Sequence, residues 1–122
     1  MTIQPEEFLE FAEYLYKNVE VFNSEPKFRT IVNRCYLASV LKAGQILEPI
    51  FGELPRDITY YESVENALAD RNAPASKDML FELRKQRNES DYNLDDSWNA
   101  ELAHKYIDFS KQLIELMKGE IV

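Results

Sequence analysis

The chain has 122 residues, 45% of them hydrophobic and 30% charged, and its 14 basic and 22 acidic residues give a formal net charge of −8. This length suffices for one domain with its own core and is too short for two. The acidic balance disfavours a dedicated non-specific nucleic-acid binder, because such proteins rely on basic surfaces and counterion release. No run approaches the roughly 18–20 consecutive apolar residues of a membrane span.

The beginning of the chain does not have the pattern of a secretory signal. Pro5, Glu6 and Glu7 stand where such a signal carries a basic segment followed by an apolar one. A single cysteine, Cys35, excludes an internal disulfide and fits a reducing compartment. We therefore expect a cytoplasmic protein that forms a single domain over residues 1–122 and has no membrane segment.

Hydrophobic periodicity predicts a first helix from about Pro5 to about Asn18. A proline and two glutamates in its first turn favour this start. Its apolar stripe is expected at Phe8, Phe11, Leu15 and Val19, with Leu9 and Ala12 beside it.

A second helix is predicted from about Pro26 to about Leu47. Its core face is expected to consist of Phe28, Ile31, Val32, Cys35, Ser39, Ala43 and Ile46. Arg29, Asn33 and Arg34 lie outside this face and Tyr36 borders it. Small residues along this helix predict the close approach of another helix.

Two further helices follow a connection rich in proline and glycine. The first is expected from about Tyr60 to about Ala69, where Thr59 and Glu62 have the spacing of a capping box. The second is expected from about Lys77 to about Glu89, with Ser76 as its cap.

The last helix is predicted from about Ser97 to about Lys118, capped by Asp95, Asp96 or Ser97. Its apolar stripe is expected at Trp98, Leu102, Tyr106, Phe109, Leu113 and Leu116. Ile107 and Ile114 lie away from this stripe and suggest a second contact surface, to another subunit. These patterns predict an all-α protein, an antiparallel bundle of four to five helices without strands.

Standard metal and cofactor sites are missing from the sequence. One cysteine and one histidine cannot form a usual zinc site, and no Gly-rich phosphate loop is present. His104 lies opposite the apolar stripe of the last helix and is expected to be exposed. We expect neither a metal nor a cofactor.

Arg87 is the residue that least fits a plain helical scaffold. Leu80, Leu83 and Arg87 share one helix face, so Arg87 extends an apolar stripe. This is a costly place for a guanidinium unless something there requires it. The simpler alternative, for Arg87 and for Arg34, is an arginine at the edge of a bundle that pairs with nearby acids.

Two segments together resemble a known family. Arg-Thr-Ile-Val-Asn-Arg-Cys-Tyr-Leu-Ala-Ser, residues 29–39, resembles the Arg-x-x-x-x-Arg-x-Tyr-Tyr-Ala helix of HEPN-domain proteins. Leu-Arg-Lys-Gln-Arg-Asn-Glu-Ser-Asp-Tyr, residues 83–92, resembles the Leu-Arg-x-x-Arg-x-x-Ala-Asp-Tyr segment of a prokaryotic branch of that superfamily. The resemblance covers nearly the whole chain and implies an all-α HEPN-like bundle that commonly forms a homodimer.

The resemblance also implies a possible activity. Many HEPN proteins are metal-independent ribonucleases, often toxins paired with a small nucleotidyltransferase antitoxin or acting in defence systems. Their active motif is an arginine, usually followed by Asn, Asp or His, and then a histidine four to six residues on. Arg87 and Asn88 match its start, but Asp91 or Tyr92 stands where the histidine would be.

The chemistry of RNA cleavage shows why this position matters. Attack by the 2′-hydroxyl needs a base, an acid and a cation for the developing phosphate charge. Arg87 could be the cation, because a guanidinium matches phosphate oxygens. Tyrosine, with an ordinary pKa of about 10, is only ~0.1% ionised at pH 7. Tyr92 could still donate a proton and Asp91 could be a weak base, but the usual apparatus is incomplete.

Two main hypotheses follow, and the sequence leaves open whether the protein is an enzyme. The first is a HEPN-like binding or assembly module with reduced or absent activity, in which Arg34 pairs with Asp91 across the bundle. The second is an endoribonuclease toxin. Its candidate catalytic residues are Arg87, Asn88, Asp91 and Tyr92, and the candidate binding residues are Arg34, Arg84 and Tyr36. An unrelated bundle with chance motif matches is a third possibility.

The expected partners follow from the resemblance. They are a second copy of the chain, a small nucleotidyltransferase antitoxin, and RNA or a nucleotide, in a prokaryotic toxin–antitoxin or defence system. No membrane is expected among them.

Overall fold

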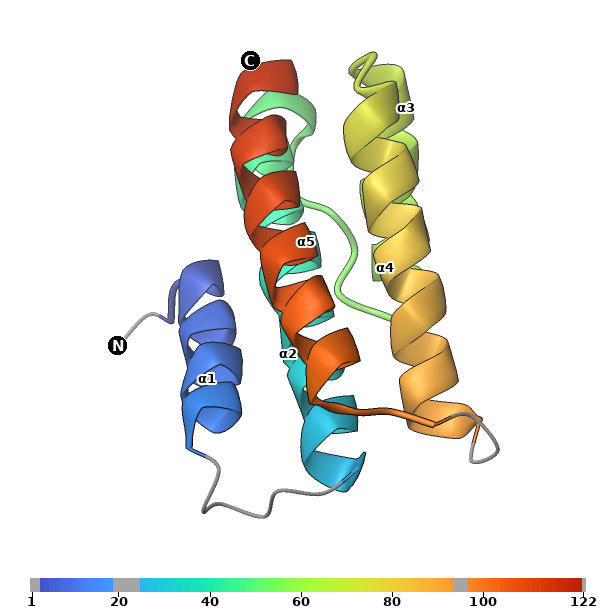
Figure 1. Ribbon diagram of the computed structural model, residues 1–122. Helices are drawn as coiled ribbons and strands as arrows, with labels where there is room; N and C mark the ends of the chain where they lie inside the picture. The colour runs from blue at the N-terminus through green and yellow to red at the C-terminus, as the bar shows by residue number, and fades with distance from the viewer. Residues whose placement is uncertain (1–2, 19–24, 94–96, 122) are drawn as a thin grey trace.

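The computed structural model describes residues 3–18, 25–93 and 97–121. These residues form five α-helices and no strand (Figure 1). The helices are α1 (Pro5–Lys17), α2 (Glu25–Phe51), α3 (Tyr60–Asp70), α4 (Pro74–Tyr92) and α5 (Ala100–Glu120). The predicted all-α bundle is confirmed.

Helix α2 is the centre of the bundle. It contacts each of the other four helices, and α5 also packs against α1 and α4. In Figure 1, α1, α5 and α4 lie next to one another, with α2 behind α5 and α3 behind α4. Among the described helices, none is long and apolar enough to cross a membrane.

Small residues bring α2 and α5 together, as their pattern predicts. Ser39 of α2 and Ser110 of α5 are both buried, and their hydroxyl oxygens lie 2.5 Å apart. Each hydroxyl oxygen also lies 3.0 Å from the carbonyl oxygen of Cys35, so one hydroxyl donates to this carbonyl and the other donates to the first hydroxyl. Cys35 is fully buried, and burial raises the pKa of its thiol to about 12, so the thiol is a core group.

Helix α1 is rotated relative to its predicted stripe. Leu9 and Ala12 are buried, whereas Phe11 is 45% exposed. The reason is that α1 packs against both α2 and α5, and the side between them is centred on Leu9 and Ala12. The predicted Val19 lies outside the described residues.

Thr59 is the N-cap residue of α3, as predicted, but the predicted side-chain caps of α3 and α4 do not form in the described part of the chain. Thr59 does not cap α3 through its side chain, because its hydroxyl and amide instead donate to Asp57 at 2.6 and 2.8 Å. Helix α4 begins at Pro74, which places Ser76 in its first turn. The free amide of Ser76 donates to Glu120 at 2.7 Å, so the end of α5 caps the start of α4.

The start of α5 also differs from the prediction. The helix begins at Ala100, and the side-chain oxygen of Asn99 accepts a hydrogen bond from Leu102 N at 2.9 Å. Asn99, and not Ser97, is therefore the cap; the predicted Asp95 and Asp96 lie outside the described residues.

The second contact surface predicted at Ile107 and Ile114 does not exist in the folded chain. Both side chains are buried, at 3% and 4% exposure. Since α5 is flanked by α1, α2 and α4, most of its circumference is covered within one chain. Ile107 and Ile114 are therefore not available for contact with a second subunit.

Gly44 gives a direct test of the packing between α2 and α3. A Cβ at Gly44 would collide with the hydroxyl of Tyr60, whereas a Cβ at Gly119 meets nothing within 4 Å. We expect Gly44→Ala to lower the free energy of unfolding by about 1–2 kcal/mol, because overpacking outweighs the gain in helix propensity. Gly119→Ala, the matched control, should raise it by up to about 1 kcal/mol. Urea denaturation of both variants measures this difference, and a stabilised Gly44→Ala would contradict it.

Candidate functional site

Arg87 lies on α4 with its side chain turned toward α2 and α3. Its guanidinium carbon is 5.7 Å from the ring centre of Tyr36 and 5.8 Å from that of Tyr61. These two rings meet edge to face, with their centres 5.4 Å apart. Only 20% of the Arg87 side chain is exposed. The cation is therefore held against two aromatic rings, an arrangement that offsets part of the loss of hydration.

Asp91 neutralises Arg87 from one turn further along α4. The Nε of Arg87 lies 3.0 Å from the Oδ2 of Asp91. Among the described residues, the Nε of Arg87 has no hydrogen-bond partner, because its N–H does not point at this oxygen, so the contact with Asp91 is an ion pair. Both side chains are mostly covered, at 20% and 25% exposure, which limits the screening of their attraction by water.

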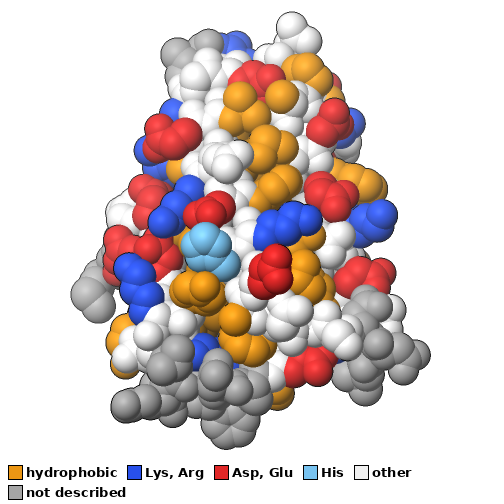
Figure 2. All heavy atoms as spheres, viewed as in Figure 1, with side chains coloured by type: hydrophobic (Ala, Val, Ile, Leu, Met, Phe, Trp, Pro, Cys, Tyr) orange, Lys and Arg blue, Asp and Glu red, His pale blue; other side chains and the backbone are white. Residues whose placement is uncertain are grey.

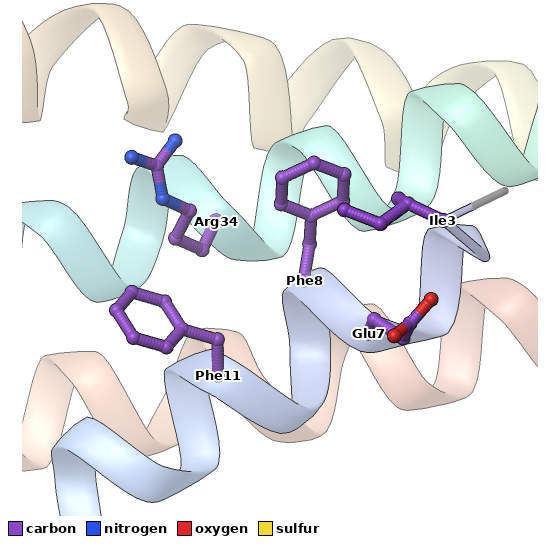
Figure 3. A pocket seen from close by; sticks show the side chains of 5 residues that line it. All are labelled: Ile3, Glu7, Phe8, Phe11 and Arg34. Atoms are coloured by element: carbon purple, nitrogen blue, oxygen red, sulfur yellow. The ribbon is translucent and has the colours of Figure 1, made fainter. Parts of the chain in front are cut away.

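Asn33 connects this pair to α2. Its side-chain nitrogen donates to Oδ2 of Asp91 at 3.2 Å, and its side-chain oxygen accepts from Nη1 of Arg34 at 3.0 Å. The predicted direct pair between Arg34 and Asp91 is therefore wrong, because Asn33 stands between them. Arg34 lies about 100° further round α2, on the side next to α1, where it lines a hollow with Phe11 (Figure 3).

Arg84 occupies a separate part of the α3–α4 contact. Its Nη2 lies 3.1 Å from Oε2 of Glu65, and its guanidinium lies 5.4 Å from the ring centre of Phe81. Glu65 is buried, at 7% exposure. Burial raises the pKa of the Glu65 carboxyl, and the positive charge of Arg84 opposes that rise.

Tyr36 is fully buried between α2, α3 and α4. Burial, and next the negative charge of Glu65, raise the pKa of its hydroxyl. That hydroxyl has no hydrogen-bond partner among the described residues. Tyr36 thus supports Arg87 with its ring, and its hydroxyl is out of reach of a ligand in solvent.

The remaining predicted catalytic residues lie apart from Arg87. Asn88 is exposed and Tyr92 is 72% exposed. No hydrogen bond or ion pair joins either to Arg87 in the described part of the chain. Of the four candidates, the structure brings together only Arg87 and Asp91.

His104 is remote from this group. It is half exposed, as predicted, and lies on α5 among acidic and basic side chains (Figure 2). Its ring lies 5.2 Å from that of Tyr16, and its Nδ1 is 3.6 Å from Asp108. No cluster of three or more metal-ligating side chains occurs within residues 3–18, 25–93 and 97–121.

The comparisons with known proteins identify no relative. No family model matches the chain, and neither curated proteins nor solved structures give a significant match.

Three residues of this site were missed from the sequence: Asn33, Tyr61 and Glu65. Asn33 lies one position before the Arg34 that the motif highlights, so only the rotation of α2 shows that it faces α4. Tyr61, Glu65 and Leu68 share a face of α3 at spacings of four and three. The position of Glu65 on the same helix face as Tyr61 and Leu68 was the feature of the sequence that could have predicted its burial.

If Arg87 is a structural cation, its removal should destabilise the fold. We expect Arg87→Ala to lower the free energy of unfolding by about 1–3 kcal/mol, because Asp91 loses its counter-ion and two rings lose a contact. Arg87→Lys, which keeps the charge but not the planar group, should cost less. Lys85→Ala is the matched control: it removes an exposed cation two residues away on α4 and should change stability by less than about 0.5 kcal/mol. Equal effects of Arg87→Ala and Lys85→Ala in urea denaturation would contradict a structural role.

Glu65 should make a recognisable contribution to the pH dependence of stability. Because its pKa is raised in the folded state, the folded protein binds this proton more tightly than the unfolded chain. Its contribution therefore falls as pH rises from the ordinary value of 4.5 to the folded value. We expect the free energy of unfolding of the parent protein, minus that of Glu65→Gln, to decrease over this range. Glu10→Gln, at an exposed position of α1, provides the control, and a difference that increases with pH would contradict the raised pKa.

Proposed function

We propose that the chain is a HEPN-like helical binding or assembly module that acts as a homodimer and has little or no ribonuclease activity. The observation that carries this proposal is that the guanidinium of Arg87 already has partners within the same chain. Its guanidinium is paired with Asp91, packed against Tyr36 and Tyr61, and only 20% of its side chain is exposed.

A catalytic arginine must reach the phosphate on which charge develops. Here Arg87 would have to leave Asp91 and two aromatic rings to do so, and Asp91 would then lose its cation. Asp91 is also held by Asn33, so its Oδ2 is engaged on two sides. The arrangement is better suited to holding α2, α3 and α4 together than to proton transfer.

The biological setting of this proposal rests on the resemblance to HEPN proteins. The two segments that carry the resemblance, residues 29–39 and 83–92, are joined by the hydrogen bond between Asn33 and Asp91. This contact makes a chance match of two separate motifs less attractive. We propose that the module acts in the cytoplasm, in an RNA- or nucleotide-related prokaryotic toxin–antitoxin or defence system. A small nucleotidyltransferase antitoxin is its candidate partner.

The competing function is a metal-independent endoribonuclease that uses Arg87 with Tyr92 or Asp91. Arg34, Arg84 and Arg87 come from adjacent helices, which is an arrangement that could attract a phosphate chain. Each of these arginines is already bound by a side chain of the same protein, and the two on α4 are paired with carboxylates. An RNA-cleavage assay decides between the two functions.

We expect the purified protein to leave labelled tRNA and mRNA intact, and Arg87→Ala and Tyr92→Phe to give the same result. The readout is the fragment pattern on a denaturing gel, with metal chelator present to suppress metal-dependent nucleases that contaminate the preparation. Lys85→Ala serves as the control for loss of a cation on α4, and circular dichroism checks that each variant is folded. Cleavage by the parent protein that is retained in Lys85→Ala and lost in Arg87→Ala would establish the ribonuclease instead.

A further inference from the structure

One side of α2 is not covered by another of the described helices. Leu37 and Leu41 lie on this side, together with Arg34, and all three are only partly buried. They lie on the opposite side of α2 from Ser39, which bonds to α5. In Figure 1, α5 stands in front of α2, so this uncovered side faces away from the viewer.

The uncovered side forms the floor of a groove with apolar walls. At one end is a hollow of about 330 Å³ lined by Ile3, Glu7, Phe8, Phe11 and Arg34 (Figure 3). At the other is a hollow of about 510 Å³ lined by Leu37, Leu41, Arg56, Asp57, Ile58, Tyr60 and Tyr61. A third hollow shares Ile3 with the first and Leu41 with the second, so the groove is continuous. We call the residues of the first two hollows the α2 groove.

Three large apolar side chains of the α2 groove are exposed to solvent. Ile3 is 61% exposed, Phe11 is 45% exposed and Ile58 is 94% exposed. In a domain that buries most of its large apolar residues, neighbouring exposed ones of this size indicate an interaction surface. Ile58 is the clearest case, since almost none of it contacts its own chain.

Among the described residues, the α2 groove also contains one cation, Arg34, and two anions, Glu7 and Asp57, that lack an ionic partner; Asp57 accepts hydrogen bonds only from the amide and hydroxyl of Thr59. Arg34 bonds only to the neutral side chain of Asn33 among the described residues. Glu7 is exposed and accepts a hydrogen bond from the backbone of Gln4 at 2.5 Å, but no Lys or Arg in the described part of the chain pairs with it. In contrast, Arg56 of the same groove pairs with Glu48.

These features make the α2 groove complementary to itself. In a twofold dimer the same patch is used on both copies, so residue i meets residue j and j meets i. A side chain that protrudes from one copy can then fill the hollow of the other copy. In the same way, the cation of each copy can pair with the anion of the other, which gives two ion pairs. A separate basic partner would leave Arg34 without an ionic partner, and a separate acidic partner would leave Glu7 and Asp57 without one.

We propose that a second copy of this chain docks on the α2 groove around a twofold axis that passes close to Leu37 and Leu41. Arg34 of each copy pairs with Glu7 of the other, and Ile58 of each copy enters the hollow beside Phe8 and Phe11 of the other. This inference rests on the proposed homodimer and names its surface. Arg34 keeps its bond to Asn33, so the interface adjoins the group that holds Arg87.

Charge reversal tests the proposed pairing. Sedimentation equilibrium of the full chain should show a dimer, and Arg34→Glu or Glu7→Arg should each raise the dimer dissociation constant by about tenfold or more, because the symmetry breaks two pairs at once. The double variant Arg34→Glu/Glu7→Arg should recover most of the affinity. Lys85→Glu, which changes the net charge as Arg34→Glu does but lies on the outer side of α4, should leave the dissociation constant unchanged.

Ile58→Asp tests the apolar part of the interface at a side chain that the fold does not need. We expect it to weaken the dimer at least as much as Arg34→Glu does, with an unchanged circular dichroism spectrum. A dimer that tolerates both Arg34→Glu and Ile58→Asp would overturn the proposed surface and leave the homodimer standing. A parent protein that is monomeric at all concentrations would overturn both the surface and the homodimer. The RNA-cleavage assay reports separately on the lack of activity.

Discussion

The packing of α2 against all four other helices is the constraint on which the rest of the structure depends. Burying a helix on most of its circumference requires small residues where a neighbour comes close, and Ser39, Ala43 and Gly44 meet this need. The two serine hydroxyls between α2 and α5 are satisfied by each other and by one carbonyl, so close approach leaves no orphaned donor. Among the described residues, the side of α2 that carries Leu37 and Leu41 remains only partly covered.

The polar residues at the edges of this packing explain the unusual position of Arg87. An arginine at the end of an apolar stripe is expensive to bury alone. Here the cost of burying Arg87 is offset by a carboxylate on the same helix and by two aromatic rings from α2 and α3. Arg84 and Glu65 form a second pair on the α3–α4 contact. Both arginines of α4 therefore contribute to joining helices, and this supports the proposed assembly role.

The partly covered side of α2 and the Arg87 site meet at Asn33 and Arg34. Asn33 turns toward α4 and bonds to Asp91, while its neighbour Arg34 turns toward α1 and the α2 groove. One helix turn thus contributes to the interior contact and to the exposed surface. A partner that engages Arg34 would act next to the residues that orient Arg87, so the two parts of the molecule are physically connected.

The sequence by itself determined the class of fold, limited the bundle to four or five helices and placed most of the buried face of α2, because these follow from hydrophobic periodicity and from turn residues. It also singled out Arg87 and Arg34 as residues with special surroundings. The tertiary structure decided the rotation of α1, since that rotation depends on the two helices it lies between. It also decided the cap of α4, because its acceptor, Glu120, comes from the far end of the chain. Finally, it decided that Asn33 stands between Arg34 and Asp91 and that Ile107 and Ile114 are covered. Each of these depends on which helices become neighbours, and a one-dimensional pattern does not carry that information.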